Sequence, residues 1–183
     1  MTARPGGGRD HRPTPPRDRS CPGRRSGRSP SLFAYYAALN LLDARVLFSK
    51  LRVAELLDPA LKGSKSALER HHLFPRNDLK KLGITDIRET NQIANFALVE
   101  WPDNISISDT APADYYPKLV EQRTASEEEL ERLRYWHALP PGWETMPYNE
   151  FLVRRRQTMS RVIRDGFRVL RHAVPTPSAG AAA

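Results

Sequence analysis

Apolar residues recur at helical spacing in three parts of the chain. Over 32–47 they predict an amphipathic helix, and either Ser29 or Ser31 can cap its start. A shorter apolar face over 50–58 predicts a second helix, which the following proline ends. The same spacing over 148–172 predicts a long helix whose other faces carry arginines.

Local end signals predict one more helix, which follows Ser126. Ser126 and Glu129 have the spacing of a capping box, and acidic residues fill the first turn, where the helix dipole favours them. A Pro-Pro-Gly cluster at 140–142 ends this helix. His137 lies next to Trp136 near its end, and we expect this histidine to be packed or to cap the helix.

The stretch 67–119 has a different pattern, because its apolar runs are short and lie among many His, Asn and Asp residues. Runs at 68–74 and 96–101 each end at a proline and predict two strands, with a helical turn over 78–82 between them. A further helix is expected after Asp103, with its length limited by Pro112. The expected fold class is mainly α with a small β-hairpin.

Composition divides the 183 residues into one domain and two tails. Residues 1–30 contain eight Arg, six Pro and five Gly with few apolar side chains, so we expect them to be disordered. The folded domain is expected over 31–174 and a short tail over 175–183.

The net charge of +8 is not spread evenly along the chain. Residues 1–30 and 151–172 each carry +6, so the segment 31–150 carries −4. A generally basic DNA-binding domain is therefore not indicated, and any phosphate contact depends on a few local residues.

Cys21 is the only cysteine, which excludes an intrachain disulfide and a thiolate zinc site. A reducing, cytoplasmic location fits this composition. No apolar run approaches the ~18 residues of a membrane span, so no membrane partner is expected.

The adjacent residues His71 and His72 are the first candidates for chemistry. On a strand their side chains point to opposite faces, so they have different roles. One imidazole can bind a divalent cation while the other accepts a proton from water, as metal-assisted phosphodiester hydrolysis requires. Taken alone, such a pair is more often a surface feature than a site.

Two asparagines strengthen the functional interpretation. Asn95 begins the second apolar run and Asn104 follows its end, so a hairpin returns both toward the histidines. The ordered segments ERHHLFP, NQIANFALVE, DNISIS and PADYYPKL resemble the His-Asn-His/Asn (HNH) finger that follows the nucleotide-binding domain of GmrSD-type modification-dependent restriction proteins. The resemblance covers 67–119 well, the helices from Ser31 more loosely, and not the first 30 residues.

This resemblance implies a ββα-metal finger, embedded here among flanking helices, with a role for each matching residue. His72 matches the catalytic general base, and His71 and Asn104 match the metal ligands. Asn95 matches the middle residue, which pins the loop that carries the base through hydrogen bonds. Many members of the wider superfamily have Asp where His71 stands, so the metal stays open between Mg²⁺ or Mn²⁺, which are favoured, and Zn²⁺ or Ni²⁺.

Arg70 and Arg76 flank the histidine pair and are candidates to bind substrate phosphate. A solvated charge beside a strand end is the alternative for each of them.

The expected function is that of an endonuclease that cuts DNA in a restriction or defence system. The family's N-terminal nucleotide-binding domain has no counterpart here, so it is expected to be a separate or missing partner. The alternative is a catalytically idle fragment that binds nucleic acid or a protein partner. A purely structural metal is disfavoured, because structural zinc sites normally have four ligands that include thiolates, and this sequence lacks such a set.

Overall fold

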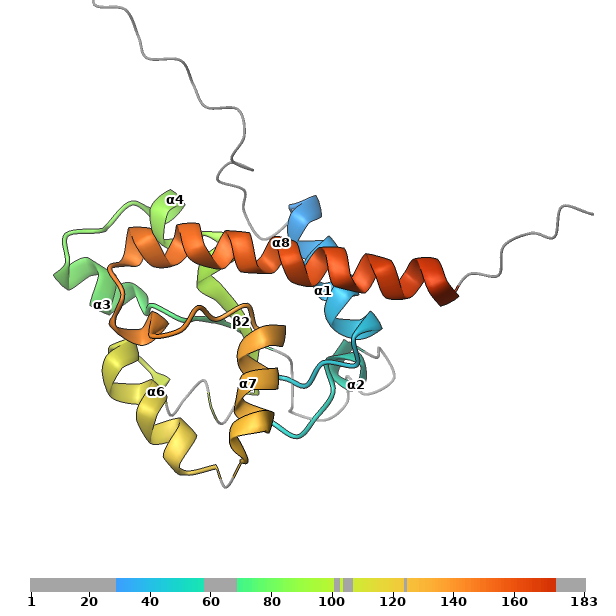
Figure 1. Ribbon diagram of the computed structural model, residues 1–183. Coiled ribbons are helices and arrows are strands. Elements are labelled where there is room, and N and C mark those ends of the chain that lie inside the picture. The colour runs from blue at the N-terminus through green and yellow to red at the C-terminus, as the bar shows by residue number, and fades with distance from the viewer. Residues whose placement is uncertain (1–28, 58–68, 101–102, 104–106, 124, 174–183) are drawn as a thin grey trace, which may run out of the picture.

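The computed structural model describes residues 29–57, 69–100, 103, 107–123 and 125–173 (Figure 1). This part of the chain is mainly helical and contains one two-stranded antiparallel sheet, as the sequence predicts. The elements are α1 (Pro30–Leu41), α2 (Val53–Leu57), β1 (Glu69–His72), α3 (Arg76–Lys81), α4 (Ile87–Thr90), η2 (Ile93–Asn95), β2 (Phe96–Val99), α6 (Pro112–Glu121), α7 (Glu127–Trp136), η3 (Trp143–Thr145) and α8 (Tyr148–Ala173). Residues 1–28 of the predicted N-terminal tail and the whole predicted C-terminal tail, 175–183, lie outside the described residues, whereas Ser29 caps α1 and Pro30 begins it.

The long C-terminal helix α8 confirms the strongest helical pattern in the sequence. Figure 1 shows α8 running across the molecule, with its C-terminal end projecting past α1. The two helices cross at Gly166, where an added Cβ would lie 2.6 Å from the Cβ of Ala38. Glycine is therefore required at this crossing. None of the helices in the described part of the chain is both long and apolar enough to cross a membrane.

The first helix is shorter than its apolar periodicity predicts. Ser29 caps α1, but the helix ends at Leu41, and Asp43 takes a left-handed conformation with φ 52°. Val46 and Leu47 are buried in extended backbone instead, and Leu47 forms an isolated parallel bridge to Val99. These two apolar residues lie in a segment beside the edge of the sheet, so the prediction of a helix to residue 47 was wrong.

The two predicted strands pair in one register. Arg70 lies opposite Leu98, and His72 lies opposite Phe96. The strands are separated by α3, α4 and η2, so this is a wide hairpin whose connection contains three short helices. Side chains of paired residues share a face of the sheet, which places Arg70 and His72 on one face and His71 on the other.

The helices α6 and α7 differ in how well local signals predict them. The capping box at the start of α7 is confirmed, because Glu129 N–H donates to Ser126 Oγ at 3.3 Å and Ser126 N–H donates to Glu129 Oε2 at 3.2 Å. Asp103 and Ile107 are helical, but residues 104–106 of the helix expected after Asp103 lie outside the described residues. Pro112 begins α6, which contains Pro117 in its interior. Buried Tyr115, Tyr116 and Leu119 hold α6 against the core despite that proline.

An aromatic cluster forms the centre of the core beside the sheet. The ring of Phe74 lies 4.7 Å from Phe151, 5.3 Å from Tyr148 and 6.0 Å from Trp143, measured between centroids. Because Phe74 follows the histidine pair by two residues, its burial anchors the chain at the end of β1. The fold thus fixes the backbone from which His72 projects.

Candidate functional site

His72 ends β1 with its imidazole half-buried and in contact with a neighbouring strand. Its ring centroid lies 4.6 Å from that of Phe96, its partner in the register. Its Nε2 lies 2.9 Å from the side-chain oxygen of Asn91, which follows α4. The ring is therefore held by Phe96 of β2 and by Asn91, which lies nineteen residues after His72 in the sequence.

The hydrogen bond to Asn91 selects one form of the neutral imidazole. An amide oxygen has no hydrogen to donate, so Nε2 of His72 carries the hydrogen and donates it in a hydrogen bond to Asn91 Oδ1. The other ring nitrogen, Nδ1, then keeps its lone pair and can accept a proton. A ring fixed in this way has the geometry that a general base requires.

The electrostatic surroundings also favour the neutral form. Burial lowers the pKa of His72 from 6.5, and the positive charges of Arg76 and Arg70 lower it further, while the hydrogen bond to Asn91 partly opposes this shift. The ring is therefore mostly neutral at pH ~7. Nδ1 therefore carries no proton on most molecules at neutral pH.

His71 points to the opposite face of the sheet, as expected for adjacent residues on a strand. It is 5% exposed, and its ring meets the edge of Tyr115 at a centroid distance of 6.1 Å with the planes 86° apart. Tyr115 belongs to α6 and donates from its hydroxyl to the backbone oxygen of Leu73 at 2.8 Å. His71 is thus held in packed surroundings on the inner side of the strand.

Asn95 is fully buried and joins the two segments that flank the His72–Asn91 pair. Its Oδ1 accepts from the backbone N–H of Phe74 at 2.9 Å, and its Nδ2 donates to the backbone oxygen of Phe74 at 3.1 Å. The same Nδ2 donates to the backbone oxygen of Thr90 at 3.1 Å. Phe74 follows His72 by two residues and Thr90 precedes Asn91, so one amide fixes both sides of the pair.

A buried arginine supports this arrangement from α8. Arg155 donates from Nη1 to the backbone oxygen of Ala94 at 2.8 Å and from Nε to that of His137 at 3.2 Å. Burial lowers the pKa of this guanidinium, and nearby tyrosine hydroxyls partly oppose the shift. Arg155 therefore ties the residue before Asn95 to the end of α7.

The two arginines that flank the histidines lie near the His72 ring. The guanidinium of Arg70 lies over the ring of Phe96, 5.8 Å from its centroid, on the face that carries His72. Arg76 begins α3 and is exposed. Both charges act on His72, since both lower its pKa.

Asn104 lies outside the described residues, so its position relative to His71 stays a prediction. The neighbouring Asp103 is described, and its carboxylate pairs with Arg123 at 2.7 Å. Among the residues that the structure describes, no group of three or more His, Cys, Asp and Glu is placed to hold a metal ion. The predicted pair of His71 and Asn104 is not a group of this kind, because it contains only one of these residue types.

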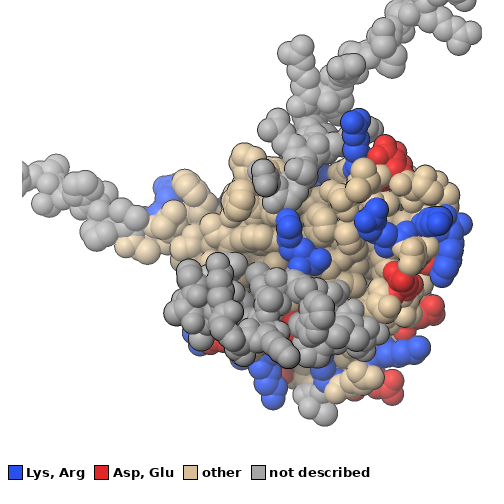
Figure 2. All heavy atoms as spheres, turned by 180° about the vertical axis from the view of Figure 1, so that it is seen from behind, with Lys and Arg blue, Asp and Glu red and all other residues tan. Residues whose placement is uncertain are grey.

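Charge on the surface is distributed in small groups. Figure 2 shows that on the face opposite to the view of Figure 1 the described Lys and Arg side chains are scattered and alternate with Asp and Glu. No continuous basic surface covers the described part of this face. Phosphate binding by this chain would depend on individual arginines such as Arg70 and Arg76, as the charge distribution along the sequence predicts.

Sequence reasoning missed Asn91 and Arg155. Asn91 is one of several polar residues in RETNQIAN, and only contact across nineteen residues distinguishes it. Arg155 stands in the run Arg154, Arg155, Arg156, where nothing but the helical phase relative to Phe151, Leu152 and Met159 marks it as buried. That phase was the available signal for Arg155.

Comparisons with protein-family models, with curated proteins and with solved structures find no match to this chain.

Proposed function

We propose that this chain is a metal-dependent endonuclease of the HNH type, with a ββα-metal finger that hydrolyses phosphodiester bonds in DNA. One observation carries this assignment: the amide of Asn95 fixes both segments that hold the His72–Asn91 pair. A partly exposed imidazole with a defined tautomer and a lowered pKa is the arrangement that a general base needs.

In this mechanism His72 acts on the attacking water. A water molecule beside Nδ1 transfers a proton to the ring, and its oxygen attacks phosphorus while the bond to the leaving oxygen breaks. Asn91 keeps the ring oriented, because its Oδ1 accepts the hydrogen bond from Nε2–H of His72 throughout. Arg70 and Arg76 neutralise the non-bridging phosphate oxygens.

The metal ligands in this proposal are His71 and Asn104. An imidazole nitrogen and an amide oxygen fill only two coordination positions, so this donor set fits a hydrolytic cation better than a closed structural site. In this proposal water and phosphate oxygens would have to reach His71 on the inner face of β1, where it is 5% exposed. When bound, a divalent cation would stabilise the negative charge on the leaving oxygen. Mg²⁺ or Mn²⁺ suits the oxygen donors, and Zn²⁺ or Ni²⁺ suits the imidazole.

A plasmid-nicking assay across these four cations tests the proposal. The wild-type protein should convert supercoiled plasmid to open circles with at least one cation and stop when EDTA is added. His72→Ala should lower the rate by about 10²–10⁴-fold, the usual contribution of a general base. The matched control is His172→Ala, which removes an exposed histidine at the end of α8 and should leave nicking unchanged.

We also propose that the substrate is DNA in a restriction or defence setting and that a separate N-terminal nucleotide-binding protein is the partner. Both follow from the resemblance of residues 67–119 alone. If DNA binds in a salt-sensitive way but is not cut with any of the cations, the alternative of an idle binding module replaces the nuclease.

A further inference from the structure

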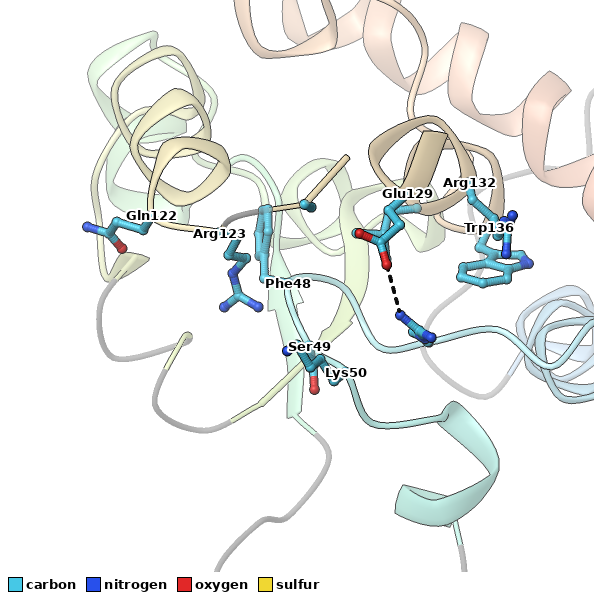
Figure 3. A pocket seen from close by; sticks show the side chains of 11 residues that line it. Phe48, Ser49, Lys50, Gln122, Arg123, Glu129, Arg132 and Trp136 are labelled. Atoms are coloured by element: carbon cyan, nitrogen blue, oxygen red, sulfur yellow. Dashed lines mark ion pairs between the residues drawn. The ribbon is translucent and has the colours of Figure 1, made fainter. Parts of the chain in front are cut away.

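A cleft of about 350 Å³ lies apart from His72, between the loop after α1 and the helices α6 and α7. Its volume is in the range of small-molecule sites. Figure 3 shows Ser49 and Lys50 at one side of the cleft, Arg123 at the end of α6, and Glu129, Arg132 and Trp136 projecting from α7. Three separate segments of the chain therefore contribute side chains to one hollow.

The lining of the cleft is strongly cationic. Arg45, Lys50, Arg123 and Arg132 line it, and Glu129 is the one carboxylate among the described lining residues. Asp103 and Glu128 lie outside the lining but pair with Arg123 and Arg132, so the charges around the cleft keep a smaller positive excess, which attracts an anion. This local excess contrasts with the net charge of −4 over residues 31–150.

The four cations differ in how firmly they are paired with carboxylates. Lys50 has no ion-pair partner among the described residues, and Arg45 meets Glu129 only at 3.7 Å. Arg132 pairs with Glu128 at 2.8 Å, but both side chains are more than half exposed. Exposed pairs of this kind contribute about 0–1 kcal/mol, so a bound anion can replace them. Arg123 is held more firmly, by Asp103 at 2.7 Å.

The loop that carries Lys50 has a strained backbone. Phe48 takes a φ of 63°, in the left-handed region that a bulky side chain rarely adopts. Its ring is buried beside Tyr116, with Arg123 over it at 5.3 Å, and the turn closes through a hydrogen bond from Ser49 N–H to the oxygen of Val46. Strain of this kind persists where the surroundings enforce it and is concentrated at binding sites.

An aromatic wall completes the cleft. Trp136 is half-buried, and Figure 3 places its indole beside Arg132 on the cleft wall. A flat ring next to several cations matches a ligand that combines a planar base with a phosphate.

We propose that this cleft binds a nucleotide, with the phosphate on Lys50, Arg45 and Arg132 and the base against Trp136. The nucleotide is either free or one unit of a nucleic-acid strand, and the chemistry of recognition is the same in both cases. The site lies outside the His72 region and requires no cleavage, so it stands or fails independently of the nuclease assignment.

Isothermal titration calorimetry on the full chain, with EDTA present to prevent cleavage, tests the site. The probes are adenosine monophosphate, adenosine, inorganic phosphate and a single-stranded hexa-adenylate. Adenosine monophosphate should bind at least about tenfold more tightly than adenosine or phosphate alone, since each part contributes. Lys50→Ala and Arg132→Ala should each weaken binding by about tenfold, the effect of losing one charge-assisted hydrogen bond.

The matched control is Lys118→Ala, which removes an exposed lysine of α6 outside the cleft and should leave affinity unchanged. If hexa-adenylate binds but the monophosphate does not, and Lys50→Ala abolishes the binding of hexa-adenylate, the ligand is one unit of a nucleic-acid strand. Binding of the monophosphate supports a free nucleotide. Three results would overturn the nucleotide site. The first is equal affinity for phosphate and adenosine monophosphate, and the second is an equal loss of affinity in Lys118→Ala and Lys50→Ala. The third is binding of none of the probes.

Discussion

His72 and His137 each place Nε2 at 2.9 Å from a carbonyl oxygen, the first at the end of β1 and the second at the end of α7. The oxygen belongs to the Asn91 side chain in the first case and to the Arg45 backbone in the second. Burial lowers the pKa of both rings, to about 4 for His137. His72 remains partly exposed, whereas His137 is 1% exposed.

The difference between them shows how the same bond serves two purposes. Around His137 the ring packs in the core and completes the hydrogen bonding of a loop, as expected from its place at a helix end. Around His72 one nitrogen is used and the ring is still accessible, with two arginines nearby. Solvent access and local charge, more than the bond itself, distinguish a candidate base from a structural histidine.

Arg155 joins the two regions, and its removal should have the largest effect. Arg155→Ala leaves a cavity and deprives the backbone oxygens of Ala94 and His137 of their donors. We expect a loss of roughly 3–5 kcal/mol in the free energy of unfolding, measured by urea denaturation. Arg154→Ala, which removes only an exposed pair with Glu150, should cost less than about 1 kcal/mol. Similar losses in the two variants would contradict the bridging role.

The second prediction concerns pH and His137. The folded protein holds this ring neutral down to a pKa of about 4, whereas the unfolded chain takes up a proton below about 6.5. The contribution of His137 to stability is therefore full above the unfolded pKa and declines as pH falls toward about 4, by about 3 kcal/mol in total.

His137→Gln isolates this contribution, since a glutamine keeps an N–H donor and does not titrate. The free energy of unfolding of wild type and variant should be measured between pH ~7 and pH ~4. The variant should lose about 3 kcal/mol less than wild type over this window. Equal pH dependence in the two proteins would show that His137 has the same pKa in the folded and the unfolded state.

The smallest predicted effect is at Asn91. Asn91→Ala frees the His72 ring, and nicking should fall by about tenfold because the productive tautomer and orientation are no longer enforced. Asn91→Asp places a negative charge at Nε2, which raises the pKa of His72 and should move the acid limb of the pH–rate profile to higher pH. Asn149→Ala, at an exposed position in α8, is the control. If the acid limb of the pH–rate profile does not move in Asn91→Asp, Asn91 does not act on the general base.

Local sequence signals predict the elements that local interactions form. The capping box at Ser126 and the apolar face of α8 were enough to predict α7 and α8. The strands were predicted within two residues because prolines bound the apolar runs. Periodicity failed at Val46 and Leu47, where a long-range bridge to β2 buries apolar residues in extended form.

The candidate site was predictable only in part, because its contacts join distant segments. The resemblance predicts that Asn95 pins the loop that carries His72, and the hydrogen bonds of its side chain to Phe74 and Thr90 supply the geometry. The pairing of His72 with Asn91 left no local signal. Asn104 lies outside the described residues, and its role stays a prediction.

Chemical rescue tests the role of His72 most directly. His72→Gly should lose metal-dependent plasmid nicking by at least about 10²-fold, and added imidazole should restore part of the rate, because the base is then supplied from solution. His137→Gly should show no rescue. Nicking by His72→Gly at the wild-type rate without imidazole would contradict the assignment of His72 as the general base.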